Sequence, residues 1–258
     1  MRQSFDLIVF DWDGTLMDSE AKIVRCMQAA AADIGIADPG AAAIRDIIGL
    51  GLSKALQVVF PEQTPAQLDQ LVERYRQHFL DLDATATPLF PGVADGLKQL
   101  SAQGYLLAVA TGKARRGLNR VLDETGLHPL FASSRCADET QSKPHPQMLE
   151  EILAETGVEN GRALMVGDTV YDMEMARNAK VAGLAVSYGV HARERLLACG
   201  ARACVDSFSE VRAWCAGAPP PSDTILILLF GTENGKRTAR QRRSLADSQE
   251  TKLGARAA

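Results

Sequence analysis

Apolar residues occur along this chain in two patterns, short unbroken runs and stripes at helical spacing. The first run, from Leu7 to Phe10, has no polar interruption, which predicts a strand buried on both faces. Similar runs predict later strands at 105–110, 163–166, 184–187 and 203–205, and helical stripes at 93–100, 118–122, 148–153, 173–179 and 194–199 separate them. This alternation predicts an α/β fold, in which a parallel sheet with right-handed connections lies between two helical layers.

The interval between the first and second predicted strands carries helical stripes and no run typical of a strand. Gly35 is placed to end the first stripe, and Gly49 and Gly51 interrupt the second. We therefore predict a three-layer, Rossmann-like core made of residues 1–16 and 88–216, with a helical domain of residues 17–87 inserted after the first strand. The apolar positions of these stripes are Ile23, Met27, Ala30, Ala31, Ile34, Ile44, Ile47, Ile48, Leu52, Leu68, Leu71, Tyr75, Phe79 and Leu82.

The last part of the chain, residues 217–258, has a different character. Three prolines at 219–221 end the last predicted helix, and the residues from 231 on are polar and basic. We expect this tail to be largely disordered, because it has too little apolar surface to offset the entropy of ordering. Its basic cluster leaves nucleic-acid binding as an alternative, although aromatic residues are missing and such binding would be salt-sensitive. The cluster consists of Lys236, Arg237, Arg240, Arg242 and Arg243.

Composition narrows the class of protein. A content of 46% hydrophobic and 23% charged residues is ordinary for a soluble globular protein. The net charge of -4 gives no electrostatic reason to expect nucleic acid or an anionic membrane as a partner. Five cysteines, an odd number without metal-ligand spacing, indicate reduced thiols and a cytoplasmic location. The start of the chain has no signal segment, and the apolar run 225–230 is far shorter than the about 20 residues that cross a bilayer.

The first predicted strand ends in two acidic residues, Asp11 and Asp13, followed by Gly14. In open α/β sheets ligands bind just beyond the carboxyl ends of the strands, so acidic residues there are placed for chemistry. Two carboxylates one residue apart repel each other unless a cation or a catalytic role offsets the repulsion. The simpler alternative is a turn, since Asp and Gly are common turn residues.

Polar residues with matching chemistry follow at three other places. Thr111 and Gly112 end the second predicted strand, where a hydroxyl group and a close-approach glycine suit a phosphate oxygen. Lys143 places a cation on a proline-rich loop, and Asp168 and Asp172 follow another predicted strand. Singly, these are a strand-end threonine, an exposed lysine and a helix-capping aspartate. Together they indicate an active site and make the turn interpretation remote.

From residue 5 to about 216 the sequence resembles the haloacid dehalogenase superfamily. Its four motifs are matched by Asp11-x-Asp13-Gly14-Thr15-Leu16, by Thr111, by Lys143 within Lys-Pro-x-Pro, and by Gly167-Asp168-Thr169-x-x-Asp172. A helical insert directly after the first motif is similar to the cap of the subfamily that contains phosphoglycolate phosphatases, β-phosphoglucomutases and the dehalogenases. Two residues depart from the pattern: Trp12 is bulkier than usual, and Gly112 stands where many relatives carry an asparagine that could help hold the substrate.

The resemblance implies a phosphatase mechanism that suits these residue types. Phosphate esters resist attack because their oxygens are negative, so the site must first neutralise charge. Asp11 is the expected nucleophile, which forms an aspartyl-phosphate, and Asp13 would protonate the leaving alcohol and then activate water. Lys143 and Thr111 would bind the phosphoryl oxygens.

The resemblance also implies Mg²⁺ as the cofactor. Mg²⁺ prefers oxygen ligands, which fits the carboxylates of Asp11 and Asp168 and the backbone carbonyl of Asp13. Asp172 would orient Lys143 or a metal-bound water from outside the ligand set.

A carboxylate at position 13 favours phosphomonoester hydrolysis, because the dehalogenases lack that acid and phosphonate-cleaving relatives carry a small residue there. We expect a small, phosphoglycolate-like phosphorylated metabolite as the substrate and a monomer or homodimer. A sugar-phosphate mutase of the same superfamily remains an alternative. Resemblance to those enzymes would imply a histidine near the start of the first cap helix, and this sequence lacks it. A non-catalytic binding module on the same fold is the other alternative, and unpaired buried carboxylates argue against it.

Substrate-binding residues are expected at the phosphoryl site and in the cap. Thr111, Gly112 and Lys143 would hold the phosphoryl group. Arg45, Lys113, Arg115, Arg116 and the loop 49–52 are candidates for a second anionic group of the substrate. Each of these cations also has the simpler interpretation of an ordinary surface residue.

Overall fold

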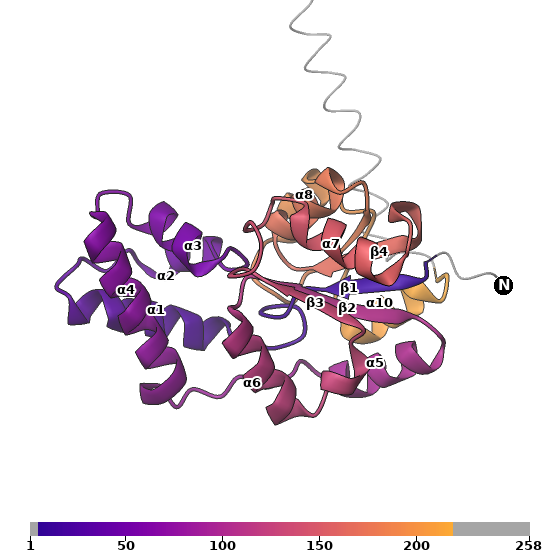
Figure 1. Ribbon diagram of the computed structural model, residues 1–258, viewed down its shortest axis with the longest axis horizontal. Helices are drawn as coiled ribbons and strands as arrows, with labels where there is room; N and C mark the ends of the chain where they lie inside the picture. Colours follow the sequence, from indigo (N-terminus) through magenta and orange to yellow (C-terminus); the bar gives the residue numbers. More distant parts are fainter. Residues whose placement is uncertain (1–4, 219–258) are drawn as a thin grey trace, which may run out of the picture. The chain divides into compact units, whose positions relative to one another are not determined.

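The sheet of this protein has the predicted site residues at the carboxyl ends of its strands and packs apolar side chains on both faces. A computed structural model describes residues 5–218, so the predicted tail beyond 218, with its basic cluster and the run 225–230, lies outside the described residues. Within that range six parallel strands form one sheet in the order β3-β2-β1-β4-β5-β6 (Figure 1). The strands are β1 (Leu7–Phe10), β2 (Leu106–Thr111), β3 (Ser133–Cys136), β4 (Ala163–Gly167), β5 (Ala182–Val186) and β6 (Cys204–Val205).

Alternate residues of β1 build the two halves of the core. Ile8 and Phe10 belong to the apolar cluster that includes residues of α5, α6 and α10 on one face of the sheet. Leu7 and Val9 belong to the cluster that includes residues of α7 and α8 on the other face. Because successive strand side chains point to opposite faces, an unbroken apolar run is what a strand between two helical layers requires. The predicted three-layer, Rossmann-like α/β fold is confirmed.

The helices of the described residues cover the sheet and form the insert after β1. They are α1 (Glu20–Asp33), α2 (Ala41–Asp46), α3 (Leu52–Val59), α4 (Pro65–Gln77), the π-helix η1 (His78–Leu82), α5 (Val93–Ala102), α6 (Arg115–Thr125), the 3₁₀-helix η2 (His128–Leu130), α7 (Gln147–Thr156), the 3₁₀-helix η3 (Asn160–Arg162), α8 (Val170–Asn178), α9 (Arg193–Ala198) and α10 (Phe208–Cys215).

Helices α1 to α4 have an apolar cluster of their own, which includes Ile23, Met27, Ile44, Leu56 and Leu71. Figure 1 shows these helices grouped beyond one end of the strands, next to the chain that leaves β1. All described residues fall within one compact unit. The division into a core and a cap of residues 17–87 therefore stays a prediction, although the separate apolar cluster supports it.

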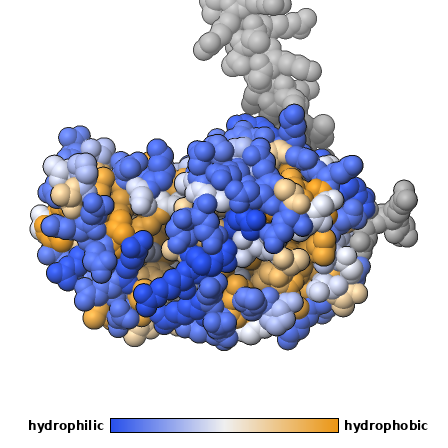
Figure 2. Space-filling view, viewed as in Figure 1, coloured by the Kyte–Doolittle hydropathy of each residue, from blue (hydrophilic) through white to orange (hydrophobic). Residues whose placement is uncertain are grey.

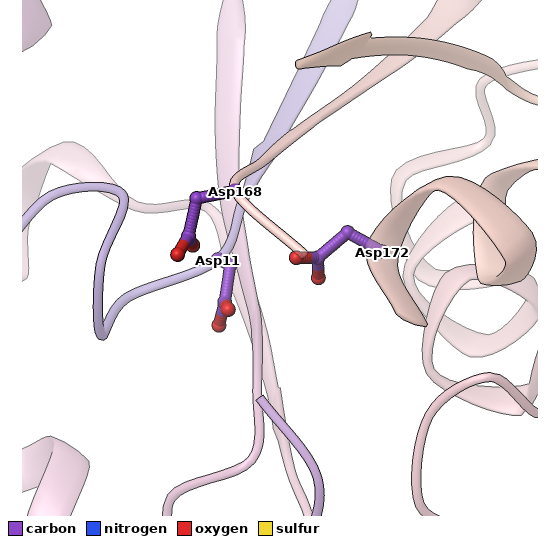
Figure 3. A group of neighbouring side chains, drawn as sticks. All are labelled: Asp11, Asp168 and Asp172. Carbon is purple, nitrogen blue, oxygen red and sulfur yellow. The ribbon is translucent and has the colours of Figure 1, made fainter. Parts of the chain in front are cut away.

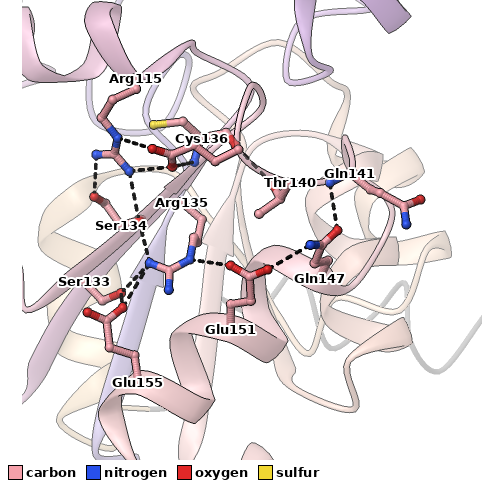
Figure 4. A network of polar contacts seen from close by, with 11 residues as sticks. Arg115, Ser133, Ser134, Arg135, Cys136, Thr140, Gln141, Gln147, Glu151 and Glu155 are labelled. Atoms are coloured by element: carbon pink, nitrogen blue, oxygen red, sulfur yellow. Dashed lines mark hydrogen bonds and ion pairs between the residues drawn. The ribbon is translucent and has the colours of Figure 1, made fainter.

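Strand β3 is absent from the sequence-based prediction. Its sequence, Ser133 to Cys136, contains no apolar run, because it is an edge strand with β2 as its neighbour in the sheet order. A polar network holds it (Figure 4): Arg135 Nε donates to Glu151 at 2.7 Å, and Arg115 donates to Ser134 Oγ at 2.8 Å. Because ion pairs hold this edge strand, its sequence has no apolar pattern from which a strand could be predicted.

The surface in Figure 2 is largely hydrophilic, with hydrophobic side chains in smaller areas between the polar ones. Among residues 5–218, none of the helices combines the length and apolar character needed to cross a membrane. The five cysteines are all free thiols, as their odd number and spacing led us to expect.

Candidate active site

The predicted site residues lie together at the carboxyl ends of three neighbouring strands, which form one edge of the sheet. Phe10 pairs in register with Val109 of β2 and Val166 of β4, so these strands end together. The next residue, Asp11, donates its backbone N–H to the carbonyl of Val166 at 2.9 Å. Thr111 ends β2 and Asp168 follows β4. The carboxyl edge of the sheet is where ligands bind in folds of this type.

Lys143 lies in the middle of this edge and is fully buried with its charge. Its Nζ atom is 2.8 Å from Asp11 Oδ1 and 2.7 Å from Asp172 Oδ1. Burial works to lower the pKa of this ammonium group, but the Asp11 and Asp172 carboxylates outweigh burial and raise it. Lys143 is therefore a permanent cation of the site rather than the exposed lysine of the simpler interpretation.

Asp11 has one carboxylate oxygen engaged and one without a partner. Oδ1 accepts the Trp12 backbone N–H at 2.7 Å in addition to its contact with Lys143. Oδ2 is buried and has no hydrogen-bond partner among residues 5–218. Burial raises the pKa of Asp11 well above its ordinary value, Lys143 opposes the rise, and the nearby Asp172 and Asp168 add to it. A buried carboxylate oxygen that no protein group satisfies is available to bind an ion or to act as a reacting group.

Three carboxylates converge at this edge. One oxygen each of Asp11, Asp168 and Asp172 lies within 4.8 Å of the others, and Figure 3 shows Asp172 pointing from its helix toward Asp11 and Asp168. Burial, followed by the charge of Asp172, raises the pKa of Asp168 to about 7. A divalent cation would remove this mutual repulsion, and hard oxygen ligands suit Mg²⁺. The residues therefore fit the implied metal.

The ligand set from the sequence overlaps with this cluster only in part. Asp11 and Asp168 belong to both. The side chain of Asp13 is not a member of the carboxylate cluster, so its predicted contribution through the backbone carbonyl stays a prediction. Asp172, which we expected to act only on Lys143 or a water, is close enough to serve as a ligand itself.

Capping of helix α8 fixes Asp172. Its Oδ2 accepts the backbone N–H of Thr169 at 3.0 Å and the Thr169 hydroxyl at 2.7 Å. The Asp172 backbone N–H donates to Thr169 Oγ at 3.3 Å in return, which completes a capping box. Oδ1 is then left to face Lys143. The N-cap residue is therefore Thr169 and not an aspartate, and Asp172 at the third helical position caps the helix with one oxygen while the other faces Lys143.

Asp168 is fixed by two donors and by the closeness of Gly14. The Thr15 hydroxyl donates to Oδ1 at 2.7 Å, and the Val190 backbone N–H donates to Oδ2 at 2.9 Å. Gly14 has a φ of +83°, and a Cβ atom there would lie 2.2 Å from Asp168 Oδ2. Only glycine meets both conditions, which explains the residue after Asp13 in physical terms.

Asp13 lies beside the other aspartates but has different partners. Its Oδ1 accepts the Ser19 hydroxyl at 2.5 Å, and Lys113 Nζ lies 2.8 and 2.9 Å from its two oxygens. Lys113 also lies 4.9 Å from the ring centroid of Phe79, in η1. Sequence reasoning missed Ser19 and Phe79 and placed Lys113 against the substrate. No spacing rule joins Lys113 to Asp13, because the two residues follow β2 and β1, which are neighbours in the sheet but distant in the sequence.

A cavity of about 920 Å³ opens between this edge and the insert helices, lined among others by Asp11, Asp13, Gly112, Lys113 and Arg116. The loop 49–52 also lines it, and its predicted contact with a second anionic group of the substrate stays a prediction. Thr111 is buried, and its hydroxyl oxygen accepts the Lys113 backbone N–H at 3.2 Å.

Two of the four cations that were candidates for a second anionic group of the substrate do not line the cavity. Arg45 is exposed and forms an ion pair with Glu20. Arg115 is held by Glu139 at 2.7 Å and by Ser134 in the network of strand β3 (Figure 4). Neither is among the residues that line the cavity. In both cases an acidic partner elsewhere satisfies the guanidinium group.

Comparisons with known proteins agree with this geometry. The model of the haloacid dehalogenase-like hydrolase family matches residues 8–186. A probable phosphatase, IndB of Dickeya dadantii, is 36% identical over 209 residues, which are 80% of this chain and 91% of that protein. The phosphoglycolate phosphatase of Agrobacterium fabrum is 31% identical over 189 residues, which are 71% and 81% of the two chains. A crystal structure of a predicted phosphoglycolate phosphatase from Haemophilus somnus has a TM-score of 0.74 at 25% identity and covers 82% of this chain and 97% of its own.

Proposed function

Because the chain belongs to the haloacid dehalogenase-like hydrolase family, with relatives that are named phosphatases, we propose that it is a Mg²⁺-dependent phosphomonoester hydrolase acting through an aspartyl-phosphate. That it is a phosphatase follows from the family and its relatives. The metal and the covalent intermediate are the proposal. One observation supports it most: Asp11 Oδ2 is buried beside the charged Lys143, and no group in the described part of the chain forms a hydrogen bond with it.

The first step joins Asp11 to the phosphoryl group. Asp11 Oδ2 attacks phosphorus, and the bond from phosphorus to the leaving oxygen breaks. Lys143 supplies positive charge beside the attacking carboxylate, and Thr111 holds a phosphoryl oxygen. A bound Mg²⁺ would supply further neutralisation of phosphoryl charge, held by Asp11, Asp168 and the carbonyl of Asp13, with Asp172 close by.

Asp13 moves the protons in both steps. It gives a proton to the leaving alcohol, and then takes one from the water whose oxygen attacks phosphorus and displaces Asp11. Ser19 and Lys113 fix the direction of its carboxyl group. Inorganic phosphate and the restored Asp11 carboxylate are the products.

We propose a small phosphorylated metabolite of the phosphoglycolate type as the substrate, on the evidence of the relatives that carry that name. Arg116 lines the cavity and suits a second anionic group of the substrate, whereas Lys113, which also lines the cavity, is paired with Asp13. The free thiols support a cytoplasmic location, which is part of the same proposal.

A panel of phosphorylated metabolites that includes phosphoglycolate tests this function. Wild-type protein with Mg²⁺ should release inorganic phosphate, and Asp11→Asn should reduce release to background, while the exposed Asp123→Asn should behave as wild type. Equal release by Asp11→Asn and wild type would contradict the assignment of Asp11. Transfer of phosphate between sugar hydroxyls without its release would instead indicate the mutase alternative.

A further inference from the structure

The connection between α2 and α3 is buried along its whole length, although connections usually run over the surface. It comprises residues 47–51, and Ile47 and Leu50 are only 3% and 8% exposed. Both side chains belong to a small apolar cluster in which the ring of Tyr171, from α8, takes part. This segment of the insert therefore packs against the sheet-bearing part of the chain.

The buried segment rests on neighbours of the proposed catalytic residues. The Gly51 backbone N–H donates to Ser142 Oγ at 2.9 Å, and Ser142 precedes Lys143. A Cβ atom on Gly49 would lie 3.1 Å from the side chain of Thr169, the residue after Asp168. The segment therefore contacts residues adjacent to Lys143 and to Asp168.

Gly112 makes the third and closest contact. A Cβ atom built there would lie 2.6 Å from the carbonyl oxygen of Leu50 and 2.7 Å from that of Gly49. Real Cβ atoms do not approach so closely, and both partners are backbone atoms that no rotamer change can move. A side chain at 112 and the observed position of the segment therefore exclude each other.

A separate group of contacts holds the start of the segment. The backbone carbonyl of Asp46, at the end of α2, accepts the Tyr171 hydroxyl at 2.8 Å, with His191 Nε2 at 3.3 Å, and Arg195 donates to its carboxylate at 2.6 Å. The Val170 N–H donates to His191 Nδ1 at 3.0 Å, so the ring proton is on Nε2 and faces Asp46. These donors satisfy a helix-end carbonyl that has no partner in the helix.

We propose that Gly112 is a positioning residue: the absence of a side chain lets the 47–51 segment, anchored at Asp46, seat against the end of β2 and close the phosphoryl site beside Thr111. Gly49 and Leu50 then form part of the cavity wall against Gly112, the residue after Thr111. A displaced segment would leave that wall open to water, which weakens the electrostatic interactions inside the site. This consequence rests on the proposed function, whereas the seating itself does not.

Hydrogen exchange measured by mass spectrometry tests the seating without any substrate. In Gly112→Ala, exchange of the Gly51 amide should become about tenfold faster or more, because its bond to Ser142 is lost on local opening. Exchange in strand β2 should not change. Gly161→Ala is the matched control, since a Cβ atom there meets no atom within 4 Å. Unchanged exchange at 49–51 in Gly112→Ala would overturn the proposal, and so would faster exchange in β2 of equal size, which would indicate a distorted strand.

A second variant weakens the contacts at Asp46 that hold the start of the segment. Tyr171→Phe removes the hydrogen bond to Asp46 and keeps the ring packed on Ile47 and Leu50, so exchange at 47–51 should rise by less than in Gly112→Ala. With phosphoglycolate and Mg²⁺, KM should rise in both variants, and it should rise by less in Tyr171→Phe than in Gly112→Ala. Exchange that rises while KM and kcat stay at wild-type values would refute the role of the segment in the site. If the wild type releases no phosphate from any ester, the proposed function fails and the exchange result still decides the seating.

Discussion

Replacing Lys143 by methionine removes the cation at the centre of three buried carboxylates. Methionine has nearly the same length and no charge, so packing is largely kept while the ion pairs to Asp11 at 2.8 Å and Asp172 at 2.7 Å are lost. Removing one partner of a buried pair typically destabilises a protein by about 3–5 kcal/mol, because the remaining charge is left uncompensated. Here two carboxylates lose their partner, and Asp168 lies within 4.8 Å of both.

The expected loss for Lys143→Met is therefore about 3–5 kcal/mol in the free energy of unfolding, measured by urea denaturation at neutral pH with a chelator present. The exposed Lys98→Met should differ from wild type by less than about 0.5 kcal/mol. Mg²⁺ should restore part of the stability of Lys143→Met, because it neutralises the same carboxylates. Stability of Lys143→Met within about 1 kcal/mol of wild type would refute the view that the buried ammonium offsets carboxylate repulsion.

Three further outcomes follow from the same contacts. Burial, followed by the charge of Asp172, raises the pKa of Asp168 from 3.8 to about 7, so the folded state binds more protons than the unfolded state between about pH 4 and 7. Metal-free protein should therefore lose stability as pH rises through that window in urea titrations, and a flat profile would count against the raised pKa. Asp13→Asn should slow formation of the phosphoenzyme, measured in single-turnover experiments, by about 10²–10⁴-fold for alkyl phosphates and by less for 4-nitrophenyl phosphate, whose leaving group needs no protonation; equal slowing on both esters would argue against proton donation by Asp13 to the leaving group. Arg45→Ala should leave KM for phosphoglycolate unchanged, because Arg45 pairs with Glu20 outside the cavity, and a raised KM would return it to the substrate site.

The sequence was sufficient for the parts of the fold that depend on apolar pattern. Leu7–Phe10 and the later runs predicted buried parallel strands, and their ends located Asp11, Thr111 and Asp168 at a single edge. Strand β3 was not predicted, because its stability comes from ion pairs such as Arg135 with Glu151. Such pairs leave no periodic signal.

Contacts between the insert and the sheet could not be predicted from spacing. Lys113 was expected to face the substrate, and the structure places it on Asp13 and Phe79. The glycine at 112 was only a departure from a motif until the carbonyls of Gly49 and Leu50 appeared against it. Both depend on how two segments distant in the sequence meet in three dimensions.

The nucleophilic role of Asp11 is the centre of this account, and trapping the covalent intermediate tests it most directly. Asp13→Asn protein mixed with 4-nitrophenyl phosphate and Mg²⁺, then quenched in acid, should accumulate the intermediate, because the good leaving group departs unaided while attack by water is slowed. Mass spectrometry of its peptides should find one added phosphoryl group on Asp11, and the Asp11→Asn, Asp13→Asn double variant should carry none. Phosphate release by Asp13→Asn with no phosphorylated peptide, or a phosphoryl group on another residue, would contradict the account.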